Sequence, residues 1–462
     1  MNNKKAALSV FSLTMITIGS VDSIRNLPAT ALFGSQLIAF FLLGAIFFLL
    51  PTALISAELS SGWPKQGGVY IWVKEAFGKR MGFLAIWLQW IENVIWYPTI
   101  LSFVGGTVGY LIDPRLADDS YFLWAVIVAS FWGVTFINLR GMQMSAFFSS
   151  ICAISGLLLP MGLIISLGVI WVAGGNTMHI NLDWHSVVPN LHDKTMWVSL
   201  TAIMLSLCGI EIATVHARDV DDPQHAFPRA LAYSVVIILS TLILGALTIA
   251  IVLPENEINL VAGIMQAFDA FFARYHLTGV MPIIAIMLVM GGLGSVNNWI
   301  IAPTKGLLVA AEDDNLPNSF SKTNNRGAPT SMLIGQAIIV TIISSLFLFM
   351  PSVNGSYWFL TALAAQLYML MYFLLLLAGI KLRLKAPEQH RPFRIPGGFA
   401  GMLLVALTGI FGVVVTFIVS FMPPEGIDVG PAGRYELMLL TGFIFLCLPP
   451  FVSAWLHKHE SK

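Results

Sequence analysis

The chain has 462 residues, of which 57% are hydrophobic and only 10% are charged, and its mean hydropathy is +0.81. About a quarter of the residues in a soluble protein are charged, so this composition excludes an assembly of soluble domains. Lys and Arg total 24, as do Asp and Glu, which leaves no basic excess for a nucleic-acid partner. We expect an all-α membrane protein with almost all of its mass in the bilayer.

Apolar runs of about 20 residues predict twelve transmembrane helices, because a helix needs about that many residues to cross the hydrocarbon core. An even number of spans places both chain termini on the same side of the membrane. The runs cover roughly residues 6–34, 36–60, 82–112, 121–139, 146–173, 195–217, 229–253, 281–311, 330–350, 355–381, 400–422 and 435–457.

The distribution of Lys and Arg in the loops predicts the orientation of these spans. If the N-terminus is cytoplasmic, nearly all of these residues fall in cytoplasmic loops, and the far side receives only Arg115, Lys194, Arg274 and Arg434. Positive residues collect on the cytoplasmic side of membrane proteins. We therefore expect a multi-pass protein of a bacterial cytoplasmic (inner) membrane, with both termini in the cytoplasm.

Two of the apolar runs contain polar stretches near their middle, at residues 19–28 of the first run and 206–211 of the sixth. An unwound turn leaves backbone groups that only a cavity or a ligand can satisfy, and paired broken helices mark the substrate site of many secondary transporters. The five-helix spacing predicts inverted repeats at roughly 6–173 and 195–381. An unbroken helix with a kink is the alternative for each run.

This arrangement predicts two parts of the chain. Residues 1–381 form a ten-helix transport core, and residues 382–462 add two further C-terminal helices.

Asp22 and Arg25 are the residues of the first span that are most costly to bury in a membrane. In a continuous helix they would share a face, and they would then form an internal ion pair. In the functional interpretation, Arg25 instead binds a substrate carboxylate through a forked hydrogen bond and Asp22 binds an amine. Both interpretations fit the sequence.

Glu211 follows the interruption of the sixth span. A partly desolvated carboxylate there can bind and release a proton near neutral pH, or it can tether the freed backbone. Glu92, in the third span, is a second candidate for proton coupling or pH sensing.

Two further spans carry polar residues that we expect to line the transport path or to join helices by hydrogen bonds. The third span places polar and aromatic residues on one helical face, and the eighth has a similar cluster. Trp299 is a candidate to pack over a substrate amine or carbon chain. The residues are Gln89, Glu92, Asn93 and Trp96 in the third span and Ser295, Asn297, Asn298 and Trp299 in the eighth.

Signatures of enzymes are absent from the sequence. It has no GxxxxGK[ST] loop for nucleotide phosphates, no HExxH and no GxSxG. Three cysteines, Cys152, Cys208 and Cys447, lie in apolar stretches without the spacing of a zinc site or a disulfide framework. We expect a protein that is not an enzyme and that has no metal and no cofactor.

Several segments resemble those of the amino acid–polyamine–organocation superfamily, and within it the glutamate/GABA antiporters of bacterial acid resistance. The resemblance covers nearly the whole chain. The segments are GWPKQGGVYIWVKEAFG, LSLCGIEIATVHARDVDDP, LPENEINLVAGIMQAF, SVNNWIIAPTKGLLVAAEDDNLP, RPFRIPGG and FMPPEGI.

The resemblance implies the LeuT-like fold, with two inverted five-helix repeats and two further helices. It also implies that the broken first and sixth helices hold the substrate's amino and carboxylate groups. Glu211 falls on the family's acidic position, and Trp299 matches a tryptophan that packs against substrate in arginine/agmatine exchangers. The substrate-binding residues expected in this way are Gly19, Ser20, Asp22, Ser23, Arg25, Ser206, Leu207, Cys208, Gly209 and Trp299.

Two departures from the family pattern concern substrate and regulation. Many relatives have Gly-Ser-Gly where this chain has Val21-Asp22-Ser23, so its carboxylate contact and its substrate can differ from theirs. The chain ends at Lys462, shortly after the last apolar run. We therefore expect no C-terminal plug like the one that closes the antiporters at neutral pH.

The sequence as a whole predicts a secondary active transporter that exchanges an amino acid for a related amino acid or amine by alternating access. The alternative is a proton-coupled amino-acid or polyamine uptake permease, with Glu211 or Glu92 as the proton carrier. A membrane sensor that binds an amino acid without moving it is a third possibility, but the chain has no soluble output domain. The expected partners are a small-molecule substrate and the lipid bilayer.

Overall fold

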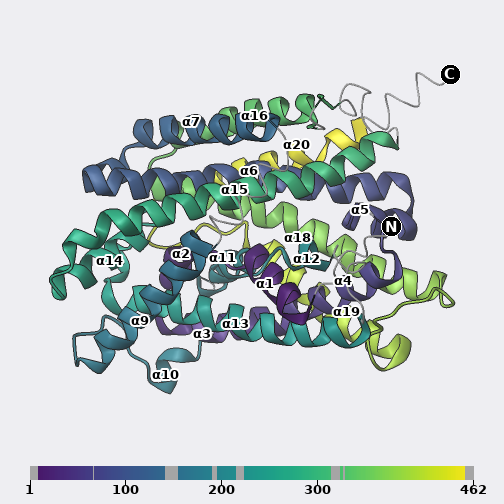
Figure 1. Ribbon diagram of the computed structural model, residues 1–462, viewed down its shortest axis with the longest axis horizontal. Coiled ribbons are helices and arrows are strands. Elements are labelled where there is room, and N and C mark those ends of the chain that lie inside the picture. Colours follow the sequence, from purple (N-terminus) through teal and green to yellow (C-terminus); the bar gives the residue numbers. More distant parts are fainter. Residues whose placement is uncertain are drawn as a thin grey trace, which may run out of the picture.

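The computed structural model describes residues 9–65, 67–140, 154–189, 195–214, 223–313, 323–325 and 328–452. Within these ranges every regular element is a helix, which confirms the all-α part of the predicted fold class. The long helices run side by side along the longest axis of the molecule and form a bundle (Figure 1). Cys152 lies outside the described residues.

Up to residue 187, several α-helices continue directly from a 3₁₀ or π-helical turn. The helices of this part are α1 (Val10–Val21), η1 (Ile24–Asn26), α2 (Leu27–Ala31), η2 (Gly34–Gln36), α3 (Leu37–Gly44), η3 (Ala45–Leu49), α4 (Leu50–Gly62), α5 (Val69–Phe77), α6 (Lys79–Ile112), η4 (Pro114–Asp118), α7 (Ser120–Leu139), η5 (Ile154–Leu158), α9 (Leu159–Ala173) and α10 (Trp184–Val187).

From residue 195 onward, 3₁₀ turns again lead directly into α-helices, as η6 does into α11 and η9 into α15. The helices of this part are η6 (Thr195–Val198), α11 (Ser199–Ser206), α12 (Ile210–Thr214), α13 (Pro223–Val252), η8 (Glu255–Glu257), α14 (Gly263–Arg274), η9 (Thr278–Val280), α15 (Met281–Glu312), α16 (Thr330–Ser344), α17 (Leu346–Phe349), α18 (Val353–Lys385), α19 (Gly398–Val419) and α20 (Ala432–Cys447).

Ten helical stretches in the described ranges are long and apolar enough to cross a membrane. They match ten of the twelve predicted runs, and the first and sixth runs contribute none of them. These stretches are Gly34–Gly62, Lys79–Ile112, Ser120–Leu139, Gly156–Ala173, Arg229–Val252, Thr278–Asn297, Thr330–Phe349, Val353–Lys385, Gly398–Val419 and Ala432–Val452.

The first and sixth runs yield short helices because the chain leaves the helical conformation in both. α1 ends at Val21, Asp22 and Ser23 have extended backbone angles, and a helical turn resumes in η1. α11 ends at Ser206, and α12 starts at Ile210 after a gap. Both interruptions coincide with the polar stretches of the sequence.

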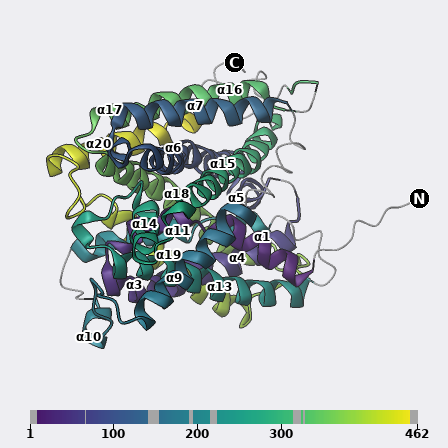
Figure 2. The same cartoon turned by 60° about the vertical axis from the view of Figure 1, so that its left-hand side comes forward.

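Close helix packing positions these segments within the bundle. α1, α11 and α12 lie between the layer of α6 and α15 and the layer of α13 and α19, while α7 and α16 run side by side at one edge (Figures 1 and 2). η5 crosses α15 at two glycines, where a Cβ on Gly156 would lie 2.1 Å from the Cα of Gly291. Only glycine permits the two backbones to approach so closely.

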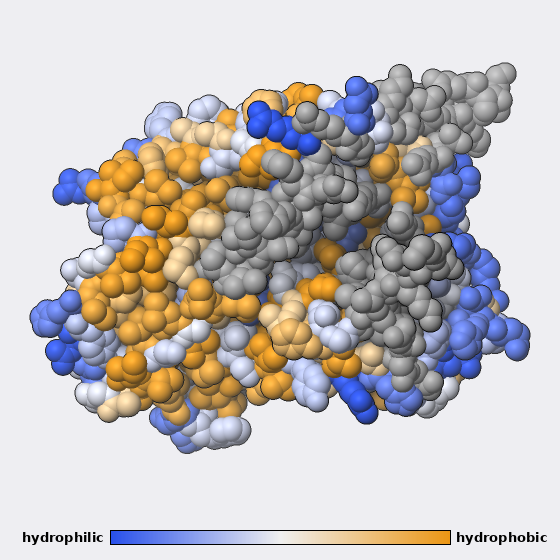
Figure 3. All heavy atoms as spheres, viewed as in Figure 1, coloured by the Kyte–Doolittle hydropathy of each residue, from blue (hydrophilic) through white to orange (hydrophobic). Residues whose placement is uncertain are grey.

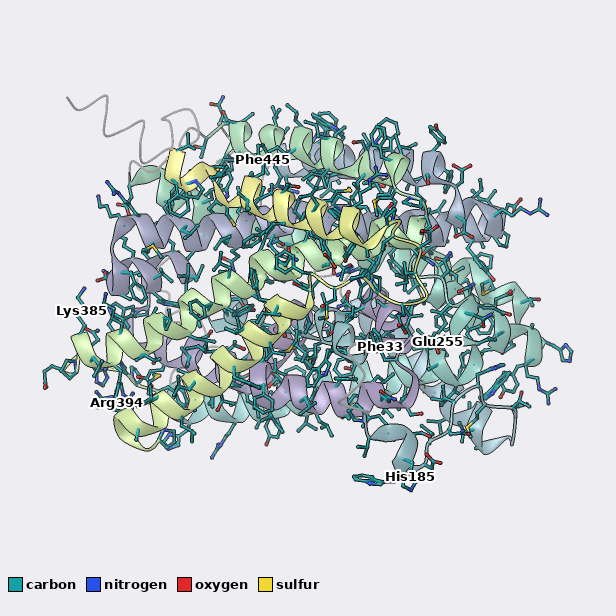
Figure 4. All side chains as sticks on the ribbon, turned by 180° about the vertical axis from the view of Figure 1, so that it is seen from behind. Phe33, His185, Glu255, Lys385, Arg394 and Phe445 are labelled. Carbon is teal, nitrogen blue, oxygen red and sulfur yellow. The ribbon has the colours of Figure 1, made fainter. Side chains whose placement is uncertain are left out.

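The surface has an apolar band with polar ends, as expected for a bundle whose helices cross a bilayer (Figure 3). Large apolar side chains of the long helices, such as Ile342, Leu404 and Phe411, are more than half exposed. Lys385 and Arg394 lie at one end of the bundle, and His185 and Glu255 lie toward the other (Figure 4). This distribution is the one expected if the long helices of the bundle cross the bilayer.

A buried ion-pair cluster joins three segments at the end marked by Lys385. Glu58, near the end of α4, is 1% exposed and forms a salt bridge with Arg383 of α18. Arg391 Nε lies 3.5 Å from Glu58 Oε1, and the Ile395 backbone N–H donates to Glu58 Oε2 at 2.8 Å. Glu58 therefore fixes the 386–397 segment to α4 and α18.

At the same end, Asp313 joins α15 to α5. Its carboxylate accepts hydrogen bonds from Lys74 and Tyr70. Burial opposes ionisation of this carboxyl, but the bonds from Lys74 and Tyr70 and the charges of Lys74 and Lys79 outweigh it and lower the pKa of Asp313. The contact stabilises the protein above the unfolded pKa of about 3.9 and weakens only as the pH falls through the folded pKa.

We expect Asp313→Asn to lower the melting temperature by the same small amount at pH 5 and pH 8, because Asp313 is fully ionised at both. A partly exposed pair of this kind contributes up to about 1 kcal/mol. Thermal unfolding of the detergent-solubilised variant and wild type at the two pH values measures the effect. A penalty confined to pH 8 would contradict the assignment.

Candidate substrate-binding site

A cavity adjoins the two interrupted segments. About 40 Å³ of it is open to the centre of a water molecule, which gives room for a few waters. An amino acid fits there only if some of the surrounding side chains move. The lining residues are Gly19, Ser20, Val21, Asp22, Ser23, Arg25, Asn26, Glu92, Asn93, Trp96, Leu205, Cys208, Ser295, Trp299 and Tyr368.

The two interruptions touch each other at Gly209. This residue has φ +109°, and a Cβ added to it would lie 2.6 Å from the Ser20 carbonyl oxygen and 3.0 Å from Trp299 Cζ2. Its backbone N–H donates to the Tyr372 hydroxyl at 2.9 Å. The break in the sixth run therefore depends on glycine for its backbone conformation and for the contact with the first run.

We expect Gly209→Ala to destabilise the protein by about 2 kcal/mol, since alanine at this φ is strained and its Cβ overlaps Ser20. Gly133→Ala in α7 is the matched control, because no other residue lies within 4 Å of the place its new methyl group would take and its φ is ordinary for a helix. Thermal unfolding measures both variants. Equal melting temperatures for the two would show that the conformation at Gly209 is not required.

Arg25 is a buried cation at the edge of this cavity and is 2% exposed. Its Nη1 donates to Thr99 Oγ1 at 2.8 Å and to the Tyr357 hydroxyl at 3.1 Å, and its guanidinium lies 5.1 Å from the centre of the Trp96 ring. No carboxylate of the described residues lies within 4 Å of it, and Nε has no hydrogen-bond partner there. Arg25 therefore keeps N–H donors for a ligand.

Asp22 also lines the cavity, and it does not pair with Arg25. Its Oδ2 accepts a hydrogen bond from Thr241 Oγ1 of α13 at 2.8 Å, whereas its buried Oδ1 has no partner among the described residues. α1 ends at Val21, and the extended residues Asp22 and Ser23 separate it from η1, so the shared helical face that an internal ion pair needs does not form. The first span thus presents an acid and a base to the cavity separately.

Glu211 does not line the cavity and instead joins three helices. Gln89 Nε2 of α6 donates to its Oε1 at 2.9 Å, the Tyr368 hydroxyl of α18 donates to the same oxygen at 2.7 Å, and Tyr372 donates to Oε2. Because Tyr372 also accepts from the Gly209 N–H, Glu211 is connected to the break itself. These hydrogen bonds hold the segment after the break against α6 and α18, which is the tethering role considered for Glu211.

The polar face of α6 turns toward the cavity, as the spacing of its residues predicts. Glu92, Asn93 and Trp96 line the cavity. Gln89 lies one turn away and reaches Glu211, and its carbonyl oxygen accepts from Asn93 Nδ2 at 2.7 Å.

In α15, Trp299 and Ser295 line the cavity, and the rings of Trp299 and Trp96 lie 5.9 Å apart. Asn297 does not: its Oδ1 accepts a hydrogen bond from Asn138 of α7 at 2.7 Å, which joins two helices away from the cavity. The side chain of Asn298 lies outside the described part of the structure.

The expected residues therefore divide into two groups. Those that line the cavity are Gly19, Ser20, Asp22, Ser23, Arg25, Glu92, Asn93, Trp96, Cys208, Ser295 and Trp299; those that do not are Gln89, Ser206, Leu207, Gly209, Glu211 and Asn297.

Tyrosines of α18 are part of the site that sequence reasoning missed. Tyr368 lines the cavity, Tyr372 contacts both Gly209 and Glu211, and Tyr357 holds Arg25. Their spacings of 11 and 15 residues place all three on one helical face. A stripe of hydroxyls in an otherwise apolar span was the available signal.

No group of three or more His, Cys, Asp or Glu side chains that might hold a metal ion occurs among the described residues. What the cavity offers is one cation, two carboxylates, serine and asparagine groups and two tryptophan rings. Such a set can bind a small molecule that carries both an anionic and a cationic group.

Comparison with known proteins agrees with this chemistry. A family model described as amino acid permease matches residues 8–445. The chain is 41% identical to an uncharacterised transporter of Legionella pneumophila, over 100% of this chain and 99% of the relative. It is 28% identical to a glutamate/gamma-aminobutyrate antiporter of Lactococcus lactis, over 99% and 92%.

A probable agmatine/putrescine antiporter of Lactococcus lactis is 22% identical over 92% of this chain and 90% of the relative. The family name and the names of these relatives describe transport and not catalysis. The chain belongs to the amino acid permease family of the amino acid–polyamine–organocation superfamily and is a multi-pass membrane protein.

Proposed function

We propose that this protein is a secondary active transporter that exchanges an amino acid for a related amino acid or amine. Twelve spans, counting the interrupted first and sixth, form two inverted five-helix repeats and two additional helices in the inner membrane of a bacterium. Both termini are cytoplasmic. The names of the antiporters similar to this chain support exchange, and the excess of Lys and Arg in alternate loops supports the orientation.

The observation that carries the proposal is the buried Arg25 beside a cavity between two interrupted helices. Arg25 binds the substrate carboxylate, and Asp22 Oδ1 binds its amine. The backbone groups freed around Ser23 and Cys208 supply further hydrogen bonds, and Trp299 packs over the carbon chain. These groups of the site replace the hydrogen bonds to water that each polar group of the substrate loses when it leaves solution.

Alternating access follows from the position of these groups. The segments that hold the substrate are short helices joined by unwound residues, so α1 or α12 can tilt without breaking a long helix. Exchange then needs only that the loaded carrier reorient faster than the empty one, in which Arg25 Nε and Asp22 Oδ1 have no hydrogen-bond partner among the described residues. No ATP is consumed.

Transport into proteoliposomes tests the proposal. Labelled glutamate, GABA, agmatine and putrescine are offered to vesicles that contain the same compounds unlabelled or that are empty. Exchange predicts uptake that depends on internal substrate for at least one of these probes. Uptake into empty vesicles that follows an imposed pH gradient would instead identify a proton-coupled permease, and no uptake under any condition would refute transport of these substrates.

A further inference from the structure

A group of basic side chains surrounds the end of α18, at the polar end of the bundle. Between residues 381 and 394 the chain has five Lys and Arg residues and a single acidic residue, Glu388. Two of the five form salt bridges with the buried Glu58 of α4. The other three are exposed to solvent, and they are Lys381, Lys385 and Arg394.

Lys381 and Lys385 are four residues apart, so they lie on the same face of α18. Lys385 Nζ donates to the carbonyl oxygen of Glu75 at 2.7 Å, and Lys381 Nζ lies 4.4 Å from the centre of the Phe77 ring. Both ammonium groups therefore lie at the end of α5. No carboxylate of the described residues lies within 4 Å of either group, so these contacts leave the two positive charges uncompensated.

Arg394 lies near the same end of α18, because the chain folds back on itself after this helix. Its Nη2 donates to the carbonyl oxygen of Pro387 at 2.8 Å, only two residues after Lys385. Arg391 Nη2 donates to the carbonyl oxygen of Ala386 at 2.9 Å and holds the returning chain in place. Figure 4 shows Lys385 and Arg394 at the same end of the bundle. Arg394 also has no carboxylate within 4 Å among the described residues.

An apolar strip of α18 leads up to these cations. Its four side chains are three to four residues apart and so share one helical face, which lies away from the face of Tyr368 and Tyr372 that meets the transport site. None of the four is buried, and the last is 61% exposed although it lies between the two lysines. The residues are Phe373, Leu377, Ile380 and Leu384.

We propose that an anionic phospholipid binds at the end of α18. Its phosphate lies among Lys381, Lys385 and Arg394, and an acyl chain follows the apolar strip toward the middle of the membrane. The lipid belongs to the leaflet at this end of the bundle, which is the cytoplasmic leaflet in the proposed orientation. Its binding does not depend on which substrate the protein exchanges.

The combination of charge and apolar surface favours a phospholipid over a soluble anion. A small anion would use the three cations but would leave the adjoining apolar strip unpaired, whereas a phospholipid covers both. Basic residues between helices on the cytoplasmic side bind anionic headgroups, and each Lys or Arg near the surface adds about fivefold in affinity. The lipid joins α5, α18 and the 386–397 segment, so it is expected to stabilise the folded protein.

Lipid binding to the full chain in a neutral detergent tests the proposal. Dioleoyl phosphatidylglycerol and dioleoyl phosphatidylcholine have the same acyl chains and differ in headgroup charge. Native mass spectrometry measures the affinity for each, and thermal unfolding measures the change in melting temperature. Wild type is expected to bind the anionic lipid at least about 25-fold more tightly and to melt at a higher temperature with it, and salt should weaken both effects.

Lys385→Gln/Arg394→Gln is expected to reduce this preference to about fivefold or less, because two of the three cations are lost. Lys385→Arg/Arg394→Lys keeps both charges and should retain the preference. The matched control is Arg115→Gln/Arg434→Gln, which removes two exposed cations predicted on the far side of the membrane and should also retain it.

Equal affinity of wild type for the two lipids would overturn the inference, as would a preference that Lys385→Gln/Arg394→Gln retains in full. Loss of the preference in Arg115→Gln/Arg434→Gln would also overturn it, because the effect would then follow net charge and not position. Glycerol 3-phosphate, which has the charge without the chains, should not raise the melting temperature at the lipid concentrations used. A rise as large as that with the lipid would identify a site for small anions instead.

Discussion

Replacement of Arg25 by Lys is expected to lower exchange by at least about 100-fold, which corresponds to about 2.7 kcal/mol. Lysine keeps the charge, but its ammonium group cannot bond Thr99 and Tyr357 while presenting a fork to a carboxylate. It also loses the contact of the guanidinium with the Trp96 ring, whose centre lies 5.1 Å from Arg25 Cζ. The loss should appear mainly as weaker binding and transport of substrates that have a carboxylate.

Exchange rates over a range of glutamate and GABA concentrations measure this effect. Cys447→Ala in α20, which does not line the cavity, serves as the control for handling and reconstitution. Trp299→Ala, which removes a ring at the cavity, should fall between the two. Equal activity in all three variants would remove the site assignment, and retention of putrescine exchange by Arg25→Lys would support the carboxylate as the partner of Arg25.

Glu58→Gln is expected to destabilise the folded protein by about 3 kcal/mol, because it leaves two buried guanidinium groups without their counter-ion. Arg383 and Arg391 both face Glu58, and their side chains are 7% and 1% exposed. The Ile395 N–H loses a charged acceptor as well. The 386–397 segment should then detach from α4 and become accessible to protease.

Glu75→Gln provides the matched control, because Glu75 pairs with Lys65 at 3.4 Å but both side chains are exposed. Surface pairs contribute about 0.2–1 kcal/mol or less. Unfolding in mixed micelles with increasing SDS compares the two variants. Similar midpoints for both would show that the cluster at Glu58 adds no more than an exposed pair.

The two glutamates of the site illustrate a limit of sequence reasoning. Both Glu92 and Glu211 were candidates for proton coupling because each is an acid in an apolar span. The distinction depends on Tyr368 and Tyr372, which lie more than 150 residues from Glu211 in the chain. No local pattern around either glutamate reveals which of them has donors.

Asp22 and Asn297 show the same limit. The three-residue spacing of Asp22 and Arg25 suggested an ion pair only on the assumption of a continuous helix, and the chain leaves the helix at that point. Asn297 shares the polarity of its neighbours in α15, yet it faces Asn138 of α7. A helical face is predictable from spacing, but the neighbour that meets this face is not.

The sequence by itself determined that this protein lies in a membrane and is helical. It also determined the ten long apolar helices and the places where two others are interrupted. These properties follow from short-range rules of hydropathy and backbone satisfaction in lipid. Only the tertiary structure decided which polar groups meet: Arg25 with Thr99 and Tyr357, Glu211 with the tyrosines of α18, and Glu92 with the open cavity. Such contacts depend on how each helix is rotated about its axis and shifted along it. Packing against helices that are distant in the sequence sets both.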